Sequence, residues 1–125
     1  MLVVENEEYL ADFWASNSKM FSWTPIVCRT PEEAMRIIDS KDGLFQVGLY
    51  DIQLSNEMNG GGLAEVTLRH KPLTVLVGIS NQWDRHSVAK ALKHFSDVFL
   101  KSDPIDKIVR GIDCAVSRAS RWRRF

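Results

Sequence analysis

The chain has 125 residues, 45% hydrophobic and 26% charged, and its 16 basic residues balance its 16 acidic ones. This composition is typical of one globular domain, spanning residues 1–125, that buries roughly two-thirds of its unfolded surface. The zero net charge gives no argument for a nucleic-acid or membrane partner. Because no apolar run approaches the ~20 residues of a membrane span and no signal-peptide pattern is present, we expect a cytoplasmic protein.

In the first half of the chain, two apolar runs are each followed by a helical pattern. Residues 1–4 predict a buried strand, and residues 7–19 predict an amphipathic helix because their apolar side chains recur at helical spacing. A second short strand is expected at 25–28. The Thr30–Glu33 sequence has the pattern of a capping box that begins a second helix, and the Lys41–Gly43 segment ends it.

The second half of the chain continues this alternation of strands and helices. A third strand at 45–50 stops at Asp51 and is followed by a polar, glycine-rich loop at 55–62. The remaining predicted elements are helices at 63–70, 83–94 and from Pro104 onward, and strands at 73–79 and 98–100. Continuous apolar strands that alternate with helices predict an α/β fold, in which helices cover both faces of a five-stranded parallel sheet.

Polar residues with useful chemistry follow four of the predicted strands. Glu5 and Asn6 follow the first strand, and the third, fourth and fifth strands end at Asp51, Ser80 and Lys101. Because ligands of open parallel sheets bind at the carboxyl ends of the strands, these side chains should converge. A carboxylate can accept a phosphoryl group as an acyl phosphate, and Mg²⁺, a lysine and a hydroxyl would offset the charge on the phosphoryl oxygens.

These motifs, which run in order along nearly the whole chain, resemble those of the response-regulator receiver domains of two-component signalling. Leu2–Glu7 is similar to the acidic motif that opens the family, and Tyr50–Leu54 with Met58–Gly60 is similar to its acceptor strand and loop. Ser80 and Phe99–Lys101 stand at its hydroxyl and lysine positions. The resemblance implies a (βα)5 three-layer sandwich, similar to flavodoxin, with strand order 2-1-3-4-5.

The resemblance also implies a function. Asp51 would accept a phosphoryl group from a histidine kinase or a phosphotransfer protein, and Ser80 and Lys101 would contact that group. Mg²⁺, the expected cofactor, would be held by oxygen atoms at the ends of the first and third strands, from Glu5, Asn6, Asp51 and the backbone carbonyl of Gln53. Such a domain is not an enzyme, since it catalyses at most its own phosphorylation and dephosphorylation.

Three positions differ from the family pattern. Asn6 stands where the family usually has Asp, which removes one negative charge from the metal site, and we expect the neighbouring Glu7 to point away. Val98 replaces an aromatic residue that turns inward on activation, and Ser102 replaces a proline that commonly follows a cis peptide bond. These differences favour an alternative function, a pseudo-receiver that dimerises or holds a partner through its fourth and fifth helices without phosphorylation.

Several other features have simpler interpretations. A flavodoxin-like cofactor enzyme is disfavoured, because three of the four residues 5–8 are acidic where phosphate-cradling loops need Gly, Ser or Thr. The basic stretch 118–125 is interpreted as a helix end or the start of a linker, in preference to a nucleic-acid contact. Cys28 and Cys114 predict two buried thiols, and Trp83 is expected at the start of the fourth helix, where it could serve a partner surface.

Overall fold

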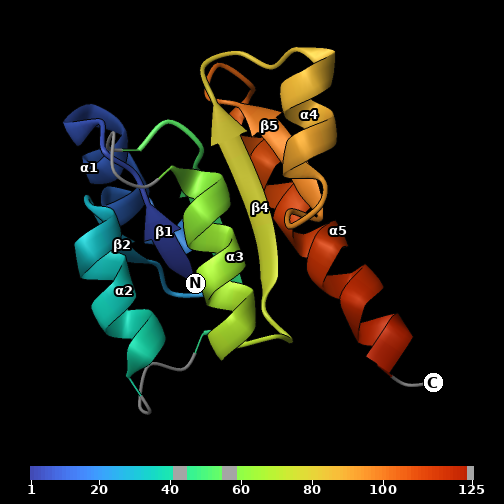
Figure 1. Ribbon diagram of the computed structural model, residues 1–125. Helices are drawn as coiled ribbons and strands as arrows, with labels where there is room; N and C mark the ends of the chain where they lie inside the picture. The colour runs from blue at the N-terminus through green and yellow to red at the C-terminus, as the bar shows by residue number, and fades with distance from the viewer. Residues whose placement is uncertain (41–44, 55–58, 124–125) are drawn as a thin grey trace.

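A computed structural model describes residues 1–40, 45–54 and 59–123, without the side chains of Ser18 and of 121–123. Within these residues, strands and helices alternate along the chain (Figure 1). The strands are β1 (Leu2–Val4), β2 (Ile26–Cys28), β3 (Val47–Asp51), β4 (Val75–Ser80) and β5 (Asp97–Leu100). The α-helices are α1 (Glu8–Ser16), α2 (Pro31–Asp39), α3 (Gly60–His70), α4 (Arg85–Ala91) and α5 (Ile105–Arg123), and a 3-10 turn, η1, spans Ser18–Met20.

The five strands form one parallel sheet in the order β2-β1-β3-β4-β5. In register, Val3 pairs with Leu49, Leu49 with Val77, and Ile79 with Phe99. The predicted fold class and strand order are therefore confirmed. The chain reverses its direction of winding between β1 and β3, and in such sheets the crevice for a ligand opens at the carboxyl ends of these strands.

Each face of the sheet packs against its own set of helices, and α2 and α3 lie side by side on one of them (Figure 1). The core under α1 and α5 includes Val3, Trp14, Leu49, Val77, Phe99, Ile108 and Ile112. The core on the opposite face, under α2 and α3, includes Leu2, Val4, Ile38, Tyr50, Leu63, Leu76 and Phe95. Successive strand residues point to opposite faces, so Phe99 joins the first core and Val98 contacts the second.

Helix α3 begins at Gly60 and not at Leu63, so part of the predicted glycine-rich loop is the first turn of this helix. Asn59 caps it, because its Oδ1 accepts a hydrogen bond from the N–H of Gly62 at 2.8 Å. A Cβ atom at Gly60 would lie 2.4 Å from the carbonyl oxygen of Asp51. Glycine here lets the helix start against the end of β3. Residues 55–58 of the predicted loop lie outside the described residues.

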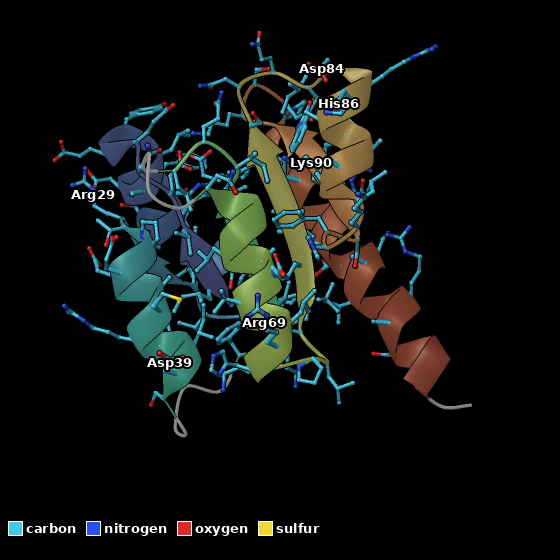
Figure 2. All side chains as sticks on the ribbon, in the orientation of Figure 1. Arg29, Asp39, Arg69, Asp84, His86 and Lys90 are labelled. Carbon is cyan, nitrogen blue, oxygen red and sulfur yellow. The ribbon has the colours of Figure 1, made fainter. Side chains whose placement is uncertain are left out.

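Helix α4 is shorter at both ends than the sequence predicts. Asp84 stands at its N-terminal end (Figure 2) and forms a capping box with Ser87, whose N–H donates to Asp84 Oδ1 at 2.7 Å. Trp83 therefore precedes the helix. It is half-buried, and its Nε1 donates a hydrogen bond to the carbonyl oxygen of Phe99 at 2.8 Å. The prediction that Trp83 begins the helix is wrong, because the cap is Asp84.

Predictions for the ends of α2 and α5 and for the two cysteines can also be compared with the structure. Thr30 caps α2 as predicted, since its Oγ1 accepts from the N–H of Glu33 at 3.1 Å, whereas the predicted helix end at 41–43 lies outside the described residues. Cys28 is buried, but Cys114 is exposed on α5, so the prediction of two buried thiols is half wrong. Helix α5 carries the basic stretch as far as Arg123, and the side chains from 121 onward are not described.

Candidate functional site

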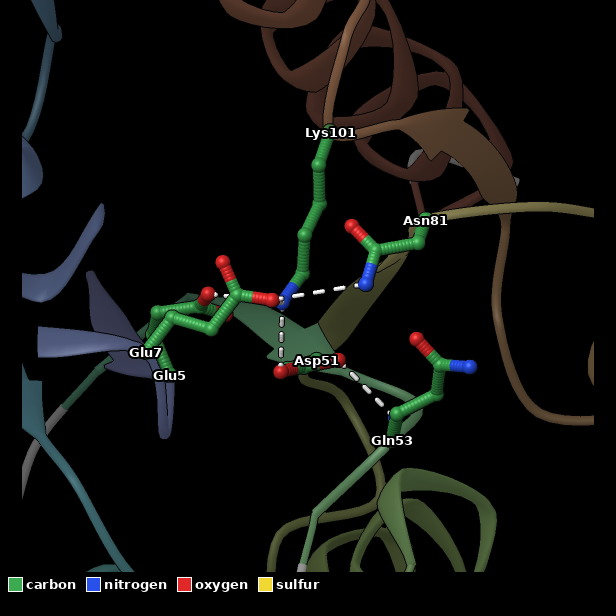
Figure 3. Close-up of polar contacts among 6 residues, drawn as sticks. All are labelled: Glu5, Glu7, Asp51, Gln53, Asn81 and Lys101. Atoms are coloured by element: carbon green, nitrogen blue, oxygen red, sulfur yellow. Dashed lines mark hydrogen bonds and ion pairs between the residues drawn. The ribbon is translucent and has the colours of Figure 1, made fainter. Parts of the chain in front are cut away.

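The predicted lysine and acceptor aspartate meet at the carboxyl edge of the sheet. The Lys101 ammonium follows β5 and donates hydrogen bonds to Asp51 Oδ2 at 2.8 Å, Glu5 Oε1 at 2.8 Å and Glu7 Oε1 at 3.1 Å (Figure 3). The Glu5 and Asp51 side chains have no exposed surface, and that of Lys101 is 5% exposed. Segments from three strands thus place one cation among three carboxylates, which we call the Lys101 cluster.

Asp51 is held at both oxygens of its carboxylate. Oδ2 accepts from Lys101, and Oδ1 accepts from the backbone N–H of Gln53 at 2.9 Å. The N–H of Ile52 donates to the carbonyl oxygen of Ile79 at 2.9 Å, so pairing with β4 continues past the end of β3. The carboxylate therefore has one orientation, at the point where the sheet edge opens.

Ser80 lies next to this cluster, at the end of β4. Ser80 is 2% exposed, and its backbone carbonyl oxygen accepts a hydrogen bond from the backbone N–H of Lys101 at 2.8 Å. Ser80 is therefore at the same edge of the sheet as Lys101 and Asp51, in contact with Lys101 through the backbone. No peptide bond of the described residues is cis, so the bond between Lys101 and Ser102 is trans. Asp103 closes it, because its Oδ2 accepts from the N–H of Leu100 at 2.8 Å.

The side chain of Glu7 points to the side opposite to the one that the sequence analysis predicts, and that of Asn6 points away from the cluster. The backbone at Glu7 is still extended, with φ −79° and ψ 117°, and adjacent side chains of an extended chain point to opposite sides. Glu7 therefore points to the same side as Glu5 and joins the Lys101 cluster, so the prediction that it points away is wrong. Asn6 is exposed and lines a surface hollow with Arg29 and Thr30, outside the cluster.

A further member of the site was missed from the sequence. Asn81, directly after β4, donates a hydrogen bond from Nδ2 to Glu7 Oε1 at 3.3 Å (Figure 3). No motif marks Asn81, because its role depends on Glu7 pointing inward. The Glu-x-Glu spacing of Glu5 and Glu7 is the signal that could have predicted this, since it has the period of an extended chain.

Burial and charge shift the ionisation of the cluster. Burial raises the pKa of Glu5 to about 8, with a further contribution from the negative charge of Asp51 and an opposing one from Lys101. The hydrogen bond from Lys101 lowers the pKa of Glu7. Burial alone would lower the pKa of Lys101, but its bonds to Asp51 and Glu5 outweigh this effect and raise it. Lys101 therefore stays charged, while Glu5 can hold a proton near neutral pH.

The donor chemistry of the site fits a hard cation such as Mg²⁺. Glu5 and Asp51 are adjacent buried carboxylates, and Glu5 Oε2 is buried without a hydrogen-bond partner. Across the residues that the structure describes, no three Asp, Glu, His or Cys side chains are grouped as a ready metal site. The Lys101 ammonium instead lies among the three carboxylates, and the predicted ligand Asn6 lies outside them.

The sequence matches no family model and no curated protein. Solved structures do match. A CheY-like response regulator receiver domain protein from Methanospirillum hungatei JF-1 aligns with a TM-score of 0.84 at 16% identity, over 96% of this chain and 94% of that one. The chain has the response-regulator receiver fold.

Two further receiver domains support this assignment of the receiver fold. The receiver domain of the Francisella response regulator 1452 aligns with a TM-score of 0.79 at 19% identity, over 94% of this chain and 95% of that one. The beryllofluoride-activated NtrC4 receiver domain dimer aligns with a TM-score of 0.80 at 19% identity, over 94% of this chain and 96% of that one. In the described part of this receiver fold, no helix is both long and apolar enough to cross a bilayer.

Proposed function

We propose that this chain is a receiver domain of two-component signalling that accepts a phosphoryl group on Asp51 from a histidine kinase or a phosphotransfer protein. The observation that carries the proposal is the contact of 2.8 Å between Lys101 Nζ and Asp51 Oδ2, with both side chains buried at the carboxyl edge of a receiver fold. This contact places a fixed positive charge beside a carboxylate nucleophile. The expected setting is cytoplasmic.

The proposed reaction is a transfer between two residues. A carboxylate oxygen of Asp51 attacks the phosphorus of a phosphohistidine, and the new O–P bond forms as the P–N bond breaks. The bonding electron pair returns to the imidazole, which takes up a proton. Lys101 would contact the phosphoryl oxygens, and Ser80 would offer its hydroxyl, so these residues contribute positioning and charge. Beyond this step and hydrolysis of the acyl phosphate, no enzymatic activity is proposed.

The proposal includes Mg²⁺ as the cofactor. Glu5, Asp51 and the backbone carbonyl of Gln53 are the residues that would hold it, with the cluster geometry changed to admit it. When bound, the ion would offset the negative charge of the phosphoryl oxygens. Asn6 is neutral and its side chain lies outside the cluster, so we expect weaker binding than at a site with Asp in this position.

Incubation of the purified chain with Mg²⁺ and acetyl phosphate, followed by intact mass measurement, tests the proposal. We expect wild type to gain one phosphate, and Asp51→Ala to gain none. The matched control is Asp39→Asn, which removes an exposed carboxylate at the far end of α2 (Figure 2) and should leave the gain unchanged. If wild type gains no phosphate, or if Asp51→Ala gains as much, the proposal is wrong.

The position of Asn6 favours a second candidate, the pseudo-receiver. One predicted metal ligand lies outside the cluster, and Lys101 donates one hydrogen bond to each of the three carboxylates. The domain would then bind a partner or dimerise through α4 and α5 without phosphorylation. Calorimetric titration with millimolar Mg²⁺ separates the two candidates, because binding supports the receiver and its absence favours the pseudo-receiver. Sedimentation with and without beryllofluoride tests dimerisation.

A further inference from the structure

The carboxylate of Glu7 joins two parts of the site that are distant in sequence. Its Oε1 accepts hydrogen bonds from Lys101 Nζ at 3.1 Å and from Asn81 Nδ2 at 3.3 Å (Figure 3). We propose that Glu7 is a positioning residue, which holds the Lys101 ammonium over Asp51 and links it to the segment between β4 and α4. The second half of this inference rests on the proposed phosphorylation of Asp51.

The first step of the argument is the direction of the Lys101 hydrogen bonds. An ammonium group has three N–H donors, and three carboxylates accept from this one: Glu5, Glu7 and Asp51. Glu5 and Asp51 lie in the buried floor of the site, whereas the Glu7 side chain is 45% exposed. Glu7 therefore fixes the ammonium from the solvent side.

The second step is the connection to α4. Asn81 directly follows Ser80 and opens the segment 81–84, which ends at the cap of α4. This segment is attached at two points, by Asn81 to Glu7 and by Trp83 to the carbonyl oxygen of Phe99 at 2.8 Å. Of these two contacts, the one between Asn81 and Glu7 uses an oxygen atom, Glu7 Oε1, that also accepts a hydrogen bond from Lys101. A movement of Lys101 therefore reaches α4 through Glu7 and Asn81.

The third step is what a phosphoryl group would change. A phosphoryl group on Asp51 brings new negative charge next to Lys101, and a lysine pairs with such a group as a point charge. Lys101 then turns from Glu7 to the phosphoryl oxygens, and Glu7 keeps Asn81 as its partner. The environment of Asn81 thus depends on the state of Asp51. This route does not need the aromatic residue that Val98 replaces.

NMR spectra of the full chain with ¹⁵N label test the resting contact, without metal or phosphate. Glu7→Gln keeps the shape and removes the charge. We expect it to shift the side-chain amide signals of Asn81, assigned with Asn81→Ala, and the backbone amides of 81–84. The matched control is Glu8→Gln, because Glu8 is 74% exposed and lies 3.9 Å from Arg29, outside the cluster. If both variants shift Asn81 equally, or neither does, the positioning role is wrong.

Addition of Mg²⁺ and beryllofluoride, a phosphoryl mimic, tests the link to α4. In wild type we expect shifts at Asn81 and across α4, and in Glu7→Gln we expect the α4 shifts to be several-fold smaller. Equal α4 shifts in both proteins would overturn the link. If wild type does not respond to beryllofluoride although Glu7→Gln shifts Asn81 in the resting state, the proposed function fails and the positioning role stands.

Discussion

Lys101 is the residue on which the balance of charge in the site depends. It is the only cation within hydrogen-bonding distance of Glu5, Glu7 and Asp51 among the described residues, and two of these carboxylates are fully buried. A buried ion pair adds little net stability compared with apolar residues, but removal of one partner leaves a buried charge without compensation. The fold therefore depends on one ammonium group at this edge of the sheet.

Replacement of this ammonium should therefore be costly. We expect Lys101→Met to lower the free energy of unfolding by about 3–5 kcal/mol near neutral pH, because the Asp51 carboxylate loses its counter-charge. Lys107→Met is the control, since Lys107 is 56% exposed and pairs with Asp103 at 3.3 Å; it should cost less than about 1 kcal/mol. Urea unfolding measures both. Equal losses would show that the Lys101 cluster has no special energetic role.

Among the elements, α3 shows how a helix start can fix the acceptor strand. Its first residue, Gly60, packs against the backbone of Asp51 and Ile52 at the end of β3, and its N–H donates to the carbonyl oxygen of Ile52 at 3.1 Å. Gly61, the next residue, is less crowded, because the nearest atom to an added Cβ would be a side-chain atom, Asn59 Oδ1, at 3.3 Å. The two glycines share a turn but differ in their neighbours.

This difference gives a paired test of the packing between α3 and β3. Alanine favours a helix over glycine by up to about 1 kcal/mol at either position. Gly60→Ala should nevertheless lower the free energy of unfolding by about 1–3 kcal/mol, because its Cβ would displace backbone atoms of β3. Gly61→Ala should leave stability unchanged or raise it slightly. Thermal unfolding of both variants checks this, and a stabilising Gly60→Ala would contradict the close approach of α3.

For the whole molecule, the site makes stability depend on pH. The folded state raises the pKa of Glu5 from 4.5 to about 8, so the folded protein binds this proton more tightly than the unfolded chain does. The stabilising contribution is complete below pH of about 4.5 and is lost as pH rises through about 8. Glu7 acts oppositely, since its lowered pKa stabilises the fold above its ordinary value, and that effect is lost only in acid.

Between about pH 5 and about pH 8, Glu5 should therefore make stability fall with pH, by at most about 1.4 kcal/mol per unit. Glu5→Gln has the same shape and does not titrate, so this slope should be smaller in the variant. Urea unfolding at several pH values gives both curves. Parallel curves for wild type and Glu5→Gln would mean that Glu5 is ionised in the folded protein throughout this range.

The contact between Asp51 and Lys101 could be predicted from the sequence, because strand ends are marked by the change from apolar to polar residues and the topology brings these ends, and that of Ser80, to one edge. The direction of Glu7 was predicted wrongly, since it depends on how far the extended backbone continues past β1, which only the Glu-x-Glu spacing indicates. The predicted starts of α3 and α4 were also wrong, because Asn59 caps α3 and Asp84 caps α4.

The two cysteines differ so much in exposure that a thiol reagent should label only one of them. Burial raises the pKa of the Cys28 thiol to about 11, so at neutral pH this thiol is protonated as well as covered. Cys114 is exposed on α5. Since the thiolate is the reactive form, a maleimide dye should attach at Cys114 alone. A fluorescent reporter can thus be placed on α5 without a substitution, so that titrations with Mg²⁺ or beryllofluoride can be followed by fluorescence.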